Sequence, residues 1–178
     1  SAAPNASSDS AAGFDLAHIL VSSFKYLQTE EDAVSCLTCI CDHLRVGGVF
    51  VLGIHTTEPD FAERSLERWR AQRDGLDVIC TIRSDPPNFK TRTEQLRSRI
   101  VARPHPRNVS STAAGETAMR YETNWTFRTY TPNQLKSMLR KEPRLRLEKT
   151  YTFHHDINKP TTLDGDDLGV VLVLRREK

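Results

Sequence analysis

Two apolar segments that flank a helix-like segment constrain the fold of this chain more than any other feature. Residues 14–21 form a nearly unbroken apolar run, which predicts a strand buried within a parallel sheet. Residues 29–45 open with a threonine N-cap and three acidic residues, which favour a helix that the Gly-Gly pair at 47–48 then ends. Residues 49–54 are apolar again and predict a second buried strand. Strand, helix and strand together make a right-handed βαβ unit.

The remaining segments predict one or two further helices and several more strands. Residues 59–73 carry an imperfect apolar stripe and are interpreted as a helix. Thr131 and Pro132 mark another helix start, because a capping residue precedes proline at the first helical position. Segments rich in Thr, Ile, Val and aromatic residues predict antiparallel strands in the middle of the chain and two closing strands: residues 77–84, 93–103, 119–130, 145–153 and 168–175. The expected fold class is therefore α/β.

The length and composition are those of one compact globular domain. The 178 residues carry a net charge of +2, which is too small to indicate nucleic-acid binding by itself. No apolar run approaches the roughly 18 residues that a membrane span needs, and no signal peptide is visible. We therefore expect a cytoplasmic protein with no membrane partner. Residues 1–13 are small and polar, and they are expected to be disordered.

Four cysteines raise the possibility of a metal site. Cys36, Cys39 and Cys41 cluster within one predicted helix, and Cys80 lies far away in the sequence. A zinc site usually needs a fourth ligand, and the sequence places none beside the cluster. The favoured interpretation is that these are packing thiols in a reducing compartment, with no metal bound.

Several segments in their order along the chain resemble a known family. Residues 14–16, 22–27 and 43–52 resemble the fourth strand, fourth helix and fifth strand of class I S-adenosylmethionine (SAM)-dependent methyltransferases of the small-molecule type. Residues 127–135 are similar to the segment that leads into the last helix of that family. Val46 departs from the proline that the family usually has before its two glycines.

The resemblance implies a specific, incomplete architecture. It is the C-terminal half of a Rossmann-like methyltransferase sheet, with the family's strands 4, 5, 7 and 6, over a partial domain at residues 14–178. Residues 77–130 would be an added antiparallel β insertion. The family holds its cofactor mainly through a Gly-rich turn and an acidic residue on its first two strands. Neither precedes Phe14, and three βα units would need roughly 90 residues. The sequence is therefore interpreted as a fragment, or as a descendant that lost its first half.

Candidate site residues follow from the expected sheet. In open α/β sheets, ligands lie beyond the carboxyl ends of the strands, which here are followed by Leu20, Val21 and Ser22 and by His55. The resemblance implies that the first three border the methionine part of SAM in the full-length parent, and that SAM binds this chain weakly or not at all. His55 is the candidate general base, because imidazole titrates near neutral pH. A structural role for this histidine stays open.

The resemblance also implies substrate contacts. Phe24 and Tyr26 would face the small-molecule substrate, and the alternative is that both side chains cap the core. An in-line methyl transfer depends mainly on positioning, so a general base is not indispensable to it.

Three functions compete at this stage. The first is a methyltransferase fragment whose parent acts on a small molecule. The second is a non-catalytic binding or scaffolding module with a degenerate methyltransferase fold, which the absence of any Gly-x-Gly pattern favours. The third, nucleic-acid binding by the arginine-rich region at residues 83–107, is disfavoured because aromatic residues are sparse there.

The first predicted strand also predicts a partner. Without the family's first half, residues 14–21 would form the open edge of the sheet, and no lysine or proline blocks pairing along them. We therefore expect the chain to self-associate through this edge, or to be held by the missing half.

Overall fold

The computed structural model describes every residue except 1–12, 59–61, 105–117 and 165–166. The expectation of disorder at residues 1–13 therefore lies almost entirely outside the described residues. The chain divides into two compact units: residues 1–58 with 130–178, here called the α/β unit, and residues 59–129, here called the β unit.

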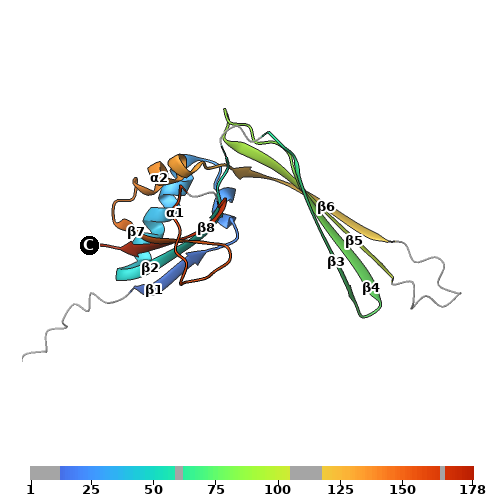
Figure 1. Cartoon of the computed structure of the whole chain (residues 1–178), viewed down its shortest axis with the longest axis horizontal. Helices are drawn as coiled ribbons and strands as arrows, with labels where there is room; N and C mark the ends of the chain where they lie inside the picture. Colours follow the sequence, from blue (N-terminus) through green and yellow to red (C-terminus); the bar gives the residue numbers. More distant parts are fainter. Residues whose placement is uncertain (1–12, 59–61, 105–117, 165–166) are drawn as a thin grey trace, which may run out of the picture. The chain divides into compact units, whose positions relative to one another are not determined.

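The α/β unit is built on a mixed four-stranded sheet with the order β1-β2-β8-β7 (Figure 1). Its elements in chain order are β1 Phe14–Ile19, the 3₁₀ helix η1 Ser23–Tyr26, α1 Glu30–His43, β2 Leu44–His55, α2 Pro132–Leu139, β7 Leu145–Thr152 and β8 Gly169–Arg176. β1 and β2 run parallel, whereas β8 is antiparallel to both of its neighbours, β2 and β7. This order matches the predicted family strands 4, 5, 7 and 6, so the predicted fold class is confirmed.

The helix α1 begins as predicted but ends earlier. Thr29 Oγ1 accepts a hydrogen bond from the Asp32 backbone N–H at 3.0 Å, as an N-cap does. The helix ends at His43, because Leu44 takes an extended conformation and buries its side chain in the core. The two glycines therefore lie inside β2. Gly47 has a φ of +81°, so they bend the strand instead of ending the helix.

The core lies where α1 and α2 pack on one face of this sheet. Alternate residues of the two central strands point into it, as the period of two along a strand requires. The buried set comprises Phe50, Leu52 and Ile54 of β2, Val170, Leu172 and Leu174 of β8, Ala33, Leu37 and Cys41 of α1, and Leu135, Met138 and Leu139 of α2. Each fully buried aliphatic side chain contributes about 1.5–3 kcal/mol relative to exposure, so this layer is the main source of the unit's stability.

The strand β1 is an edge strand, not the buried strand that its composition predicts. It pairs only with β2, and Phe14 and Leu16 are 67% and 56% exposed. A parallel strand is buried when strands pair on both of its sides and helices cover both faces. Neither condition holds for β1 in the part of the chain that the structure describes.

The β unit is an antiparallel meander of four strands in the order β3-β4-β5-β6. The strands are β3 Ser65–Arg73, β4 Leu76–Ser84, β5 Thr93–Pro104 and β6 Met119–Arg128. Three of them overlap closely with the predicted strands at 77–84, 93–103 and 119–130. The fully buried carboxylate of Asp77 joins three strands, because it accepts hydrogen bonds from Arg70 at 2.7 Å and from Arg103 at 3.0 Å.

The helix predicted at residues 59–73 is wrong. Residues 65–73 instead form β3, which pairs with β4 over its whole length. The turn between them is Asp74-Gly75, where both residues have positive φ, 52° and 77°. This is the geometry of a two-residue hairpin, for which Asp-Gly is a favoured sequence. The Asp-Gly turn is thus the sequence feature that indicates a hairpin, whereas the apolar spacing of residues 59–73 does not distinguish a helix from a strand.

Candidate functional site

The turn after β1 is strained, and it presents apolar side chains outward. Val21 and Ser22 have φ values of 54° and 59°, a left-handed conformation that is rare for a β-branched residue such as valine. The Val21 side chain is 80% exposed, and Leu20 is 41% exposed. Strain of this kind persists where surrounding contacts hold it, and here the Ser22 backbone N–H donates to the Gly53 carbonyl at 2.9 Å.

Ser22 and His55 meet at the carboxyl ends of the two parallel strands. The hydroxyl oxygen of the buried Ser22 accepts a hydrogen bond from the His55 backbone N–H at 3.0 Å. The same oxygen lies 2.9 Å from Nδ1 of the exposed His55 imidazole. The predicted site residues Leu20, Val21, Ser22 and His55 are therefore brought together at one edge of the sheet.

The contact between Ser22 and His55 sets what the imidazole can do. The hydroxyl oxygen has two lone pairs, so it can accept from the backbone N–H and from Nδ1–H together. In that tautomer Nε2 carries a lone pair and can accept a proton. In the other tautomer the hydroxyl donates to Nδ1, and Nε2–H is a donor. Ser22 thus orients His55 in either tautomer.

Phe153 and Gly169 also lie next to His55, and the sequence analysis did not identify them. The ring of Phe153 contacts it edge-on, with a centroid distance of 4.5 Å. Gly169 is the strand partner of His55, and a Cβ there would lie 3.1 Å from the Phe153 ring. The pairing of β8 with β2 on one side and with β7 on the other brings these three residues together, so no local sequence pattern could have identified them.

The two candidate substrate residues differ in position. Phe24 is 1% exposed and belongs to the core, where its ring lies 6.1 Å from that of Tyr130. This burial favours the core-capping alternative for Phe24. Tyr26 is 54% exposed, so much of its side chain lies at the surface. The roles of both residues stay predictions.

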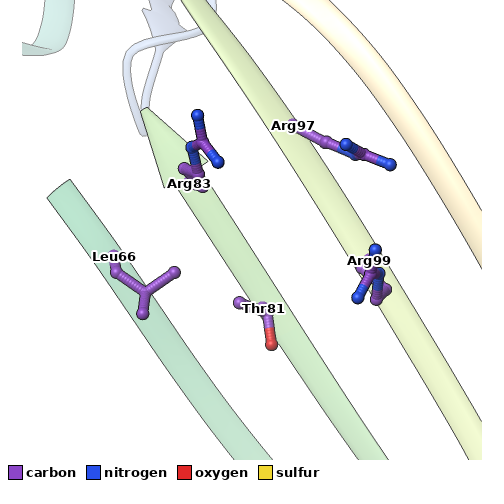
Figure 2. Close-up of a pocket in the computed structure, with 5 residues that line it drawn as sticks. All are labelled: Leu66, Thr81, Arg83, Arg97 and Arg99. Carbon is purple, nitrogen blue, oxygen red and sulfur yellow. The ribbon is translucent and has the colours of Figure 1, made fainter. Parts of the chain in front are cut away.

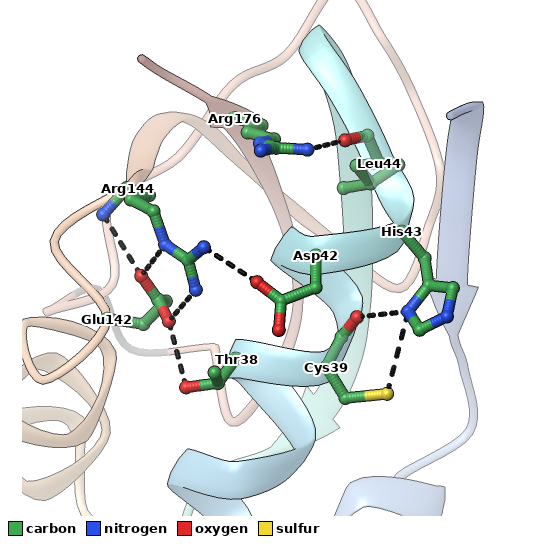
Figure 3. A network of polar contacts seen from close by, with 8 residues as sticks. All are labelled: Thr38, Cys39, Asp42, His43, Leu44, Glu142, Arg144 and Arg176. Atoms are coloured by element: carbon green, nitrogen blue, oxygen red, sulfur yellow. Dashed lines mark hydrogen bonds and ion pairs between the residues drawn. The ribbon is translucent and has the colours of Figure 1, made fainter. Parts of the chain in front are cut away.

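A buried carboxylate joins α1 to the segment after α2, away from the strand ends. Glu142 is 4% exposed and accepts two hydrogen bonds from the Arg144 guanidinium, both at 2.8 Å (Figure 3). Thr38 of α1 donates to the same carboxylate at 2.9 Å, and Arg144 also reaches Asp42 at 2.7 Å. The Arg144 hydrogen bonds lower the pKa of Glu142 to about 2. This network is a structural tie between two elements.

The clustered cysteines lie on different sides of α1. Cys41 is buried, Cys36 is partly buried and Cys39 is exposed. Burial raises the pKa of the Cys41 thiol to about 11, which keeps it protonated and unreactive. Among the described residues, no group of three or more His, Cys, Asp or Glu side chains is arranged to hold a metal ion.

The arginine-rich region of the β unit lines a small pocket of about 200 Å³ (Figure 2). Arg83, Arg97 and Arg99 lie around it on neighbouring strands. Carboxylates partly neutralise them: Glu122 pairs with Arg97 and with Arg99, and Asp85 pairs with Arg83. The strand residues on this face include no aromatic ring on which a base could stack.

Comparison with solved structures identifies the fold. A SAM-dependent methyltransferase from Clostridium acetobutylicum matches 93% of this chain and 59% of its own, with a TM-score of 0.66 and 15% identity. The amino pentose methyltransferase CalS10 from Micromonospora echinaspora, solved with SAM bound, matches 93% and 59%, with a TM-score of 0.65 and 13% identity. The sugar N-methyltransferase KedS8 from a Streptoalloteichus species matches 94% and 58%, with a TM-score of 0.67 and 15% identity.

These matches confirm the resemblance at the level of the fold. The chain has the fold of the C-terminal part of a SAM-dependent small-molecule methyltransferase, and it spans just under three fifths of the length of the structures that it matches. No family model and no curated protein sequence matches it. Of the helices that the structure describes, none is long and apolar enough to cross a membrane.

Proposed function

We propose that this chain is the substrate-side part of a SAM-dependent methyltransferase that acts on a small molecule. The observation that carries the proposal is the Ser22–His55 contact, because it places a proton acceptor where parallel strands end. The similar structures support the class of reaction, since each is described as a methyltransferase.

The residues at this edge suit one end of the cofactor. Leu20 and Val21 offer exposed apolar surface on a turn that bonding to β2 fixes, which fits the methionine arm and sulfonium region. The sequence has no Gly-x-Gly pattern for the remainder of SAM. We therefore propose that a region outside this sequence supplies the other contacts, and that this chain alone binds SAM weakly or not at all.

His55 is proposed as the general base. When bound, SAM supplies an electrophilic methyl group. With that methyl group supplied, Nε2 of His55 would take the proton that the substrate amine or hydroxyl loses. In this role Ser22 Oγ accepts a hydrogen bond from Nδ1–H, which leaves the lone pair on Nε2 to accept the proton. We propose that the exposed Tyr26 contacts the substrate.

Amino sugars are the first substrates to test. Two of the similar proteins are described as an amino pentose methyltransferase and a sugar N-methyltransferase. A substrate amine is largely protonated at neutral pH, so a base that accepts its proton would be useful for this class. The four free cysteines suit the reducing cytoplasm, where we propose that the protein acts.

The alternative is a non-catalytic module that keeps the fold for binding or scaffolding. The missing Gly-rich turn is the observation that favours it. In that case the strained turn and the contact between Ser22 and His55 would have no catalytic purpose, and replacing His55 would leave every activity of the protein unchanged.

The test begins with the coding sequence upstream of Ser1. The proposal expects a strand with a Gly-rich turn there, and a longer product that binds SAM in calorimetry and transfers a labelled methyl group to an amino sugar or another small molecule. A folded longer product that neither binds SAM nor transfers the methyl group would favour the scaffolding alternative.

A further inference from the structure

One face of the sheet in the β unit carries most of the arginines of that unit. In an antiparallel sheet, residues that are partners across strands share a face, and neighbours in the sequence alternate. The register therefore assigns a set of arginines to the same face: Arg68, Arg70, Arg83, Arg97, Arg99, Arg103 and Arg120. Among the strand residues that the structure describes on this face, the carboxylates are Asp77 and Glu122. The face is therefore strongly positive, although the whole chain has a net charge of only +2.

Three of these arginines line a pocket (Figure 2). Arg83 lies on β4, Arg97 and Arg99 lie on β5, and Leu66 and Thr81 complete the lining. The pocket has a volume of about 200 Å³, whereas sites for drug-sized ligands have about 300–1,000 Å³. It therefore suits a small charged group better than a whole cofactor.

Two carboxylates hold the three guanidinium groups in place. Arg99 Nε donates to Glu122 at 2.6 Å, and Arg97 donates to the other oxygen of the same carboxylate. Arg83 Nη2 donates to Asp85 at 2.8 Å. These hydrogen bonds lower the pKa of both carboxyl groups, so both stay charged near neutral pH. Because the guanidinium groups are already oriented, binding a ligand to them costs less side-chain entropy.

The same guanidinium groups have further donors for a ligand. Each guanidinium has five N–H groups. In the part of the chain that the structure describes, one nitrogen of Arg97, one of Arg99 and two of Arg83 donate to the two carboxylates. The N–H groups of the other nitrogens are not used by these carboxylates. Arg68 adds a fourth positive charge, because it lies in the same cross-strand row as Thr81 and Arg99.

We propose that this pocket binds a phosphate group, either as the free ion or as the monoester of a small molecule. The four arginines outnumber Glu122 and Asp85, and this excess of positive charge suits a phosphate, which carries about 1.5–2 negative charges at neutral pH. A tetrahedral phosphate offers at least three oxygens to the three guanidinium groups, whereas a carboxylate offers two. The Thr81 hydroxyl can donate to a further oxygen.

Calorimetric titration of the chain with inorganic phosphate at constant ionic strength tests the proposal. The wild-type chain should bind one phosphate saturably. Arg97→Gln and Arg99→Gln should each raise the dissociation constant by more than about tenfold, because each removes a charge and charge-assisted hydrogen bonds. Arg73→Gln removes the same charge from the opposite face of the sheet and should change the constant by less than about twofold.

Thr81→Val tests the pocket without changing its charge. Valine suits a strand, so this variant should fold, and the loss of the hydroxyl should raise the dissociation constant by about three- to tenfold. Thermal unfolding of every variant separates lost binding from lost folding. Titration with glycerol 3-phosphate distinguishes the two sources of the phosphate group. Tighter binding than that of inorganic phosphate indicates a monoester, and equal or weaker binding indicates the free ion.

Three outcomes would overturn the proposal. The absence of saturable binding at millimolar phosphate would exclude the site. Equal losses in Arg73→Gln and Arg97→Gln would mean that the net charge of the unit attracts phosphate without a pocket. An affinity that survives Arg97→Gln, Arg99→Gln and Thr81→Val alike would place the phosphate elsewhere on the chain. Because phosphate binding is measured without SAM, its outcome is independent of the proposed methyl transfer.

Discussion

At the scale of single residues, the proposed chemistry depends on one imidazole and the hydroxyl that orients it. In the longer product that is proposed to bind SAM, His55→Asn removes the proton acceptor. Its kcat should therefore fall by about 10²-fold while the SAM dissociation constant stays within about twofold. If His55 is the base, kcat of the wild type should decrease toward acidic pH, and this decrease should be absent in His55→Asn. Initial-rate kinetics and calorimetry measure these quantities.

The exposed His154 supplies the matched control for that substitution. His154→Asn should leave kcat and its pH profile unchanged. Equal losses in both variants would show that His55 has no special role, and a loss of SAM binding in His55→Asn would assign it to the cofactor instead of to proton transfer.

A second prediction for a single residue concerns Glu142 and the stability of the folded chain. Its pKa is lowered from an ordinary 4.5 to about 2, chiefly by Arg144, so the folded state gains stability when the carboxylate is charged. That stabilisation is complete above the unfolded pKa and is lost as the pH falls from about 4.5 toward 2. Glu142→Gln should therefore lower the free energy of unfolding by about 2–3 kcal/mol at neutral pH.

The pH dependence distinguishes this explanation from a packing defect. The difference between wild type and Glu142→Gln in urea unfolding should shrink as the pH falls through the window from 4.5 to 2. Glu177→Gln removes an exposed partner of Arg146 and should cost less than about 1 kcal/mol. A constant difference across this window would contradict the electrostatic account.

At the scale of elements, most strands and helices could be predicted, because their signals are local. The capping box of α2 is an example: Thr131 and Gln134 exchange side-chain and backbone hydrogen bonds, as a threonine before proline suggests. Pairing could not be predicted in the same way. The exposure of β1 depends on which strands flank it, and the contacts of His55 with Phe153 and Gly169 depend on where β8 lies.

The open edge of β1 gives a prediction at this scale. Among the described residues, no strand other than β2 pairs with β1, so this edge with its exposed Phe14 and Leu16 forms a template for another strand, from the proposed SAM-binding region or from a second copy. Leu16→Lys should disfavour pairing along this edge. Any association of the chain that grows with concentration should therefore decrease in Leu16→Lys, as sedimentation would detect.

Lys149 on β7, at the far edge of the same sheet, offers a comparison, because that edge already carries a charge. Lys149→Leu tests whether charge at an edge governs pairing, and it should increase association if it does. If neither Leu16→Lys nor Lys149→Leu changes the association, neither edge of this sheet pairs with another chain.

At the scale of the whole molecule, the two units differ in sheet topology and in the residues that they expose. The α/β unit carries the strained turn and His55, and its sheet order is that of the methyltransferase fold. The β unit has an arginine-rich face, on which Arg83, Arg97 and Arg99 line a small pocket. The sequence predicted three strands of this unit, and Asp74-Gly75 is a hairpin sequence that could have indicated the fourth, whereas the face on which each side chain lies emerges only from the register.

The central claim is that SAM contacts this chain at the carboxyl ends of β1 and β2. The most direct measurement is a nuclear magnetic resonance titration of the isotope-labelled longer product with SAM, because this chain alone is proposed to bind SAM weakly or not at all. Within the residues of this chain, the account predicts saturable shifts confined to the amides of residues 20–22 and 53–56, with none in the β unit. Shifts confined to the arginine-lined face, or no shift at saturating SAM in the longer product, would contradict it.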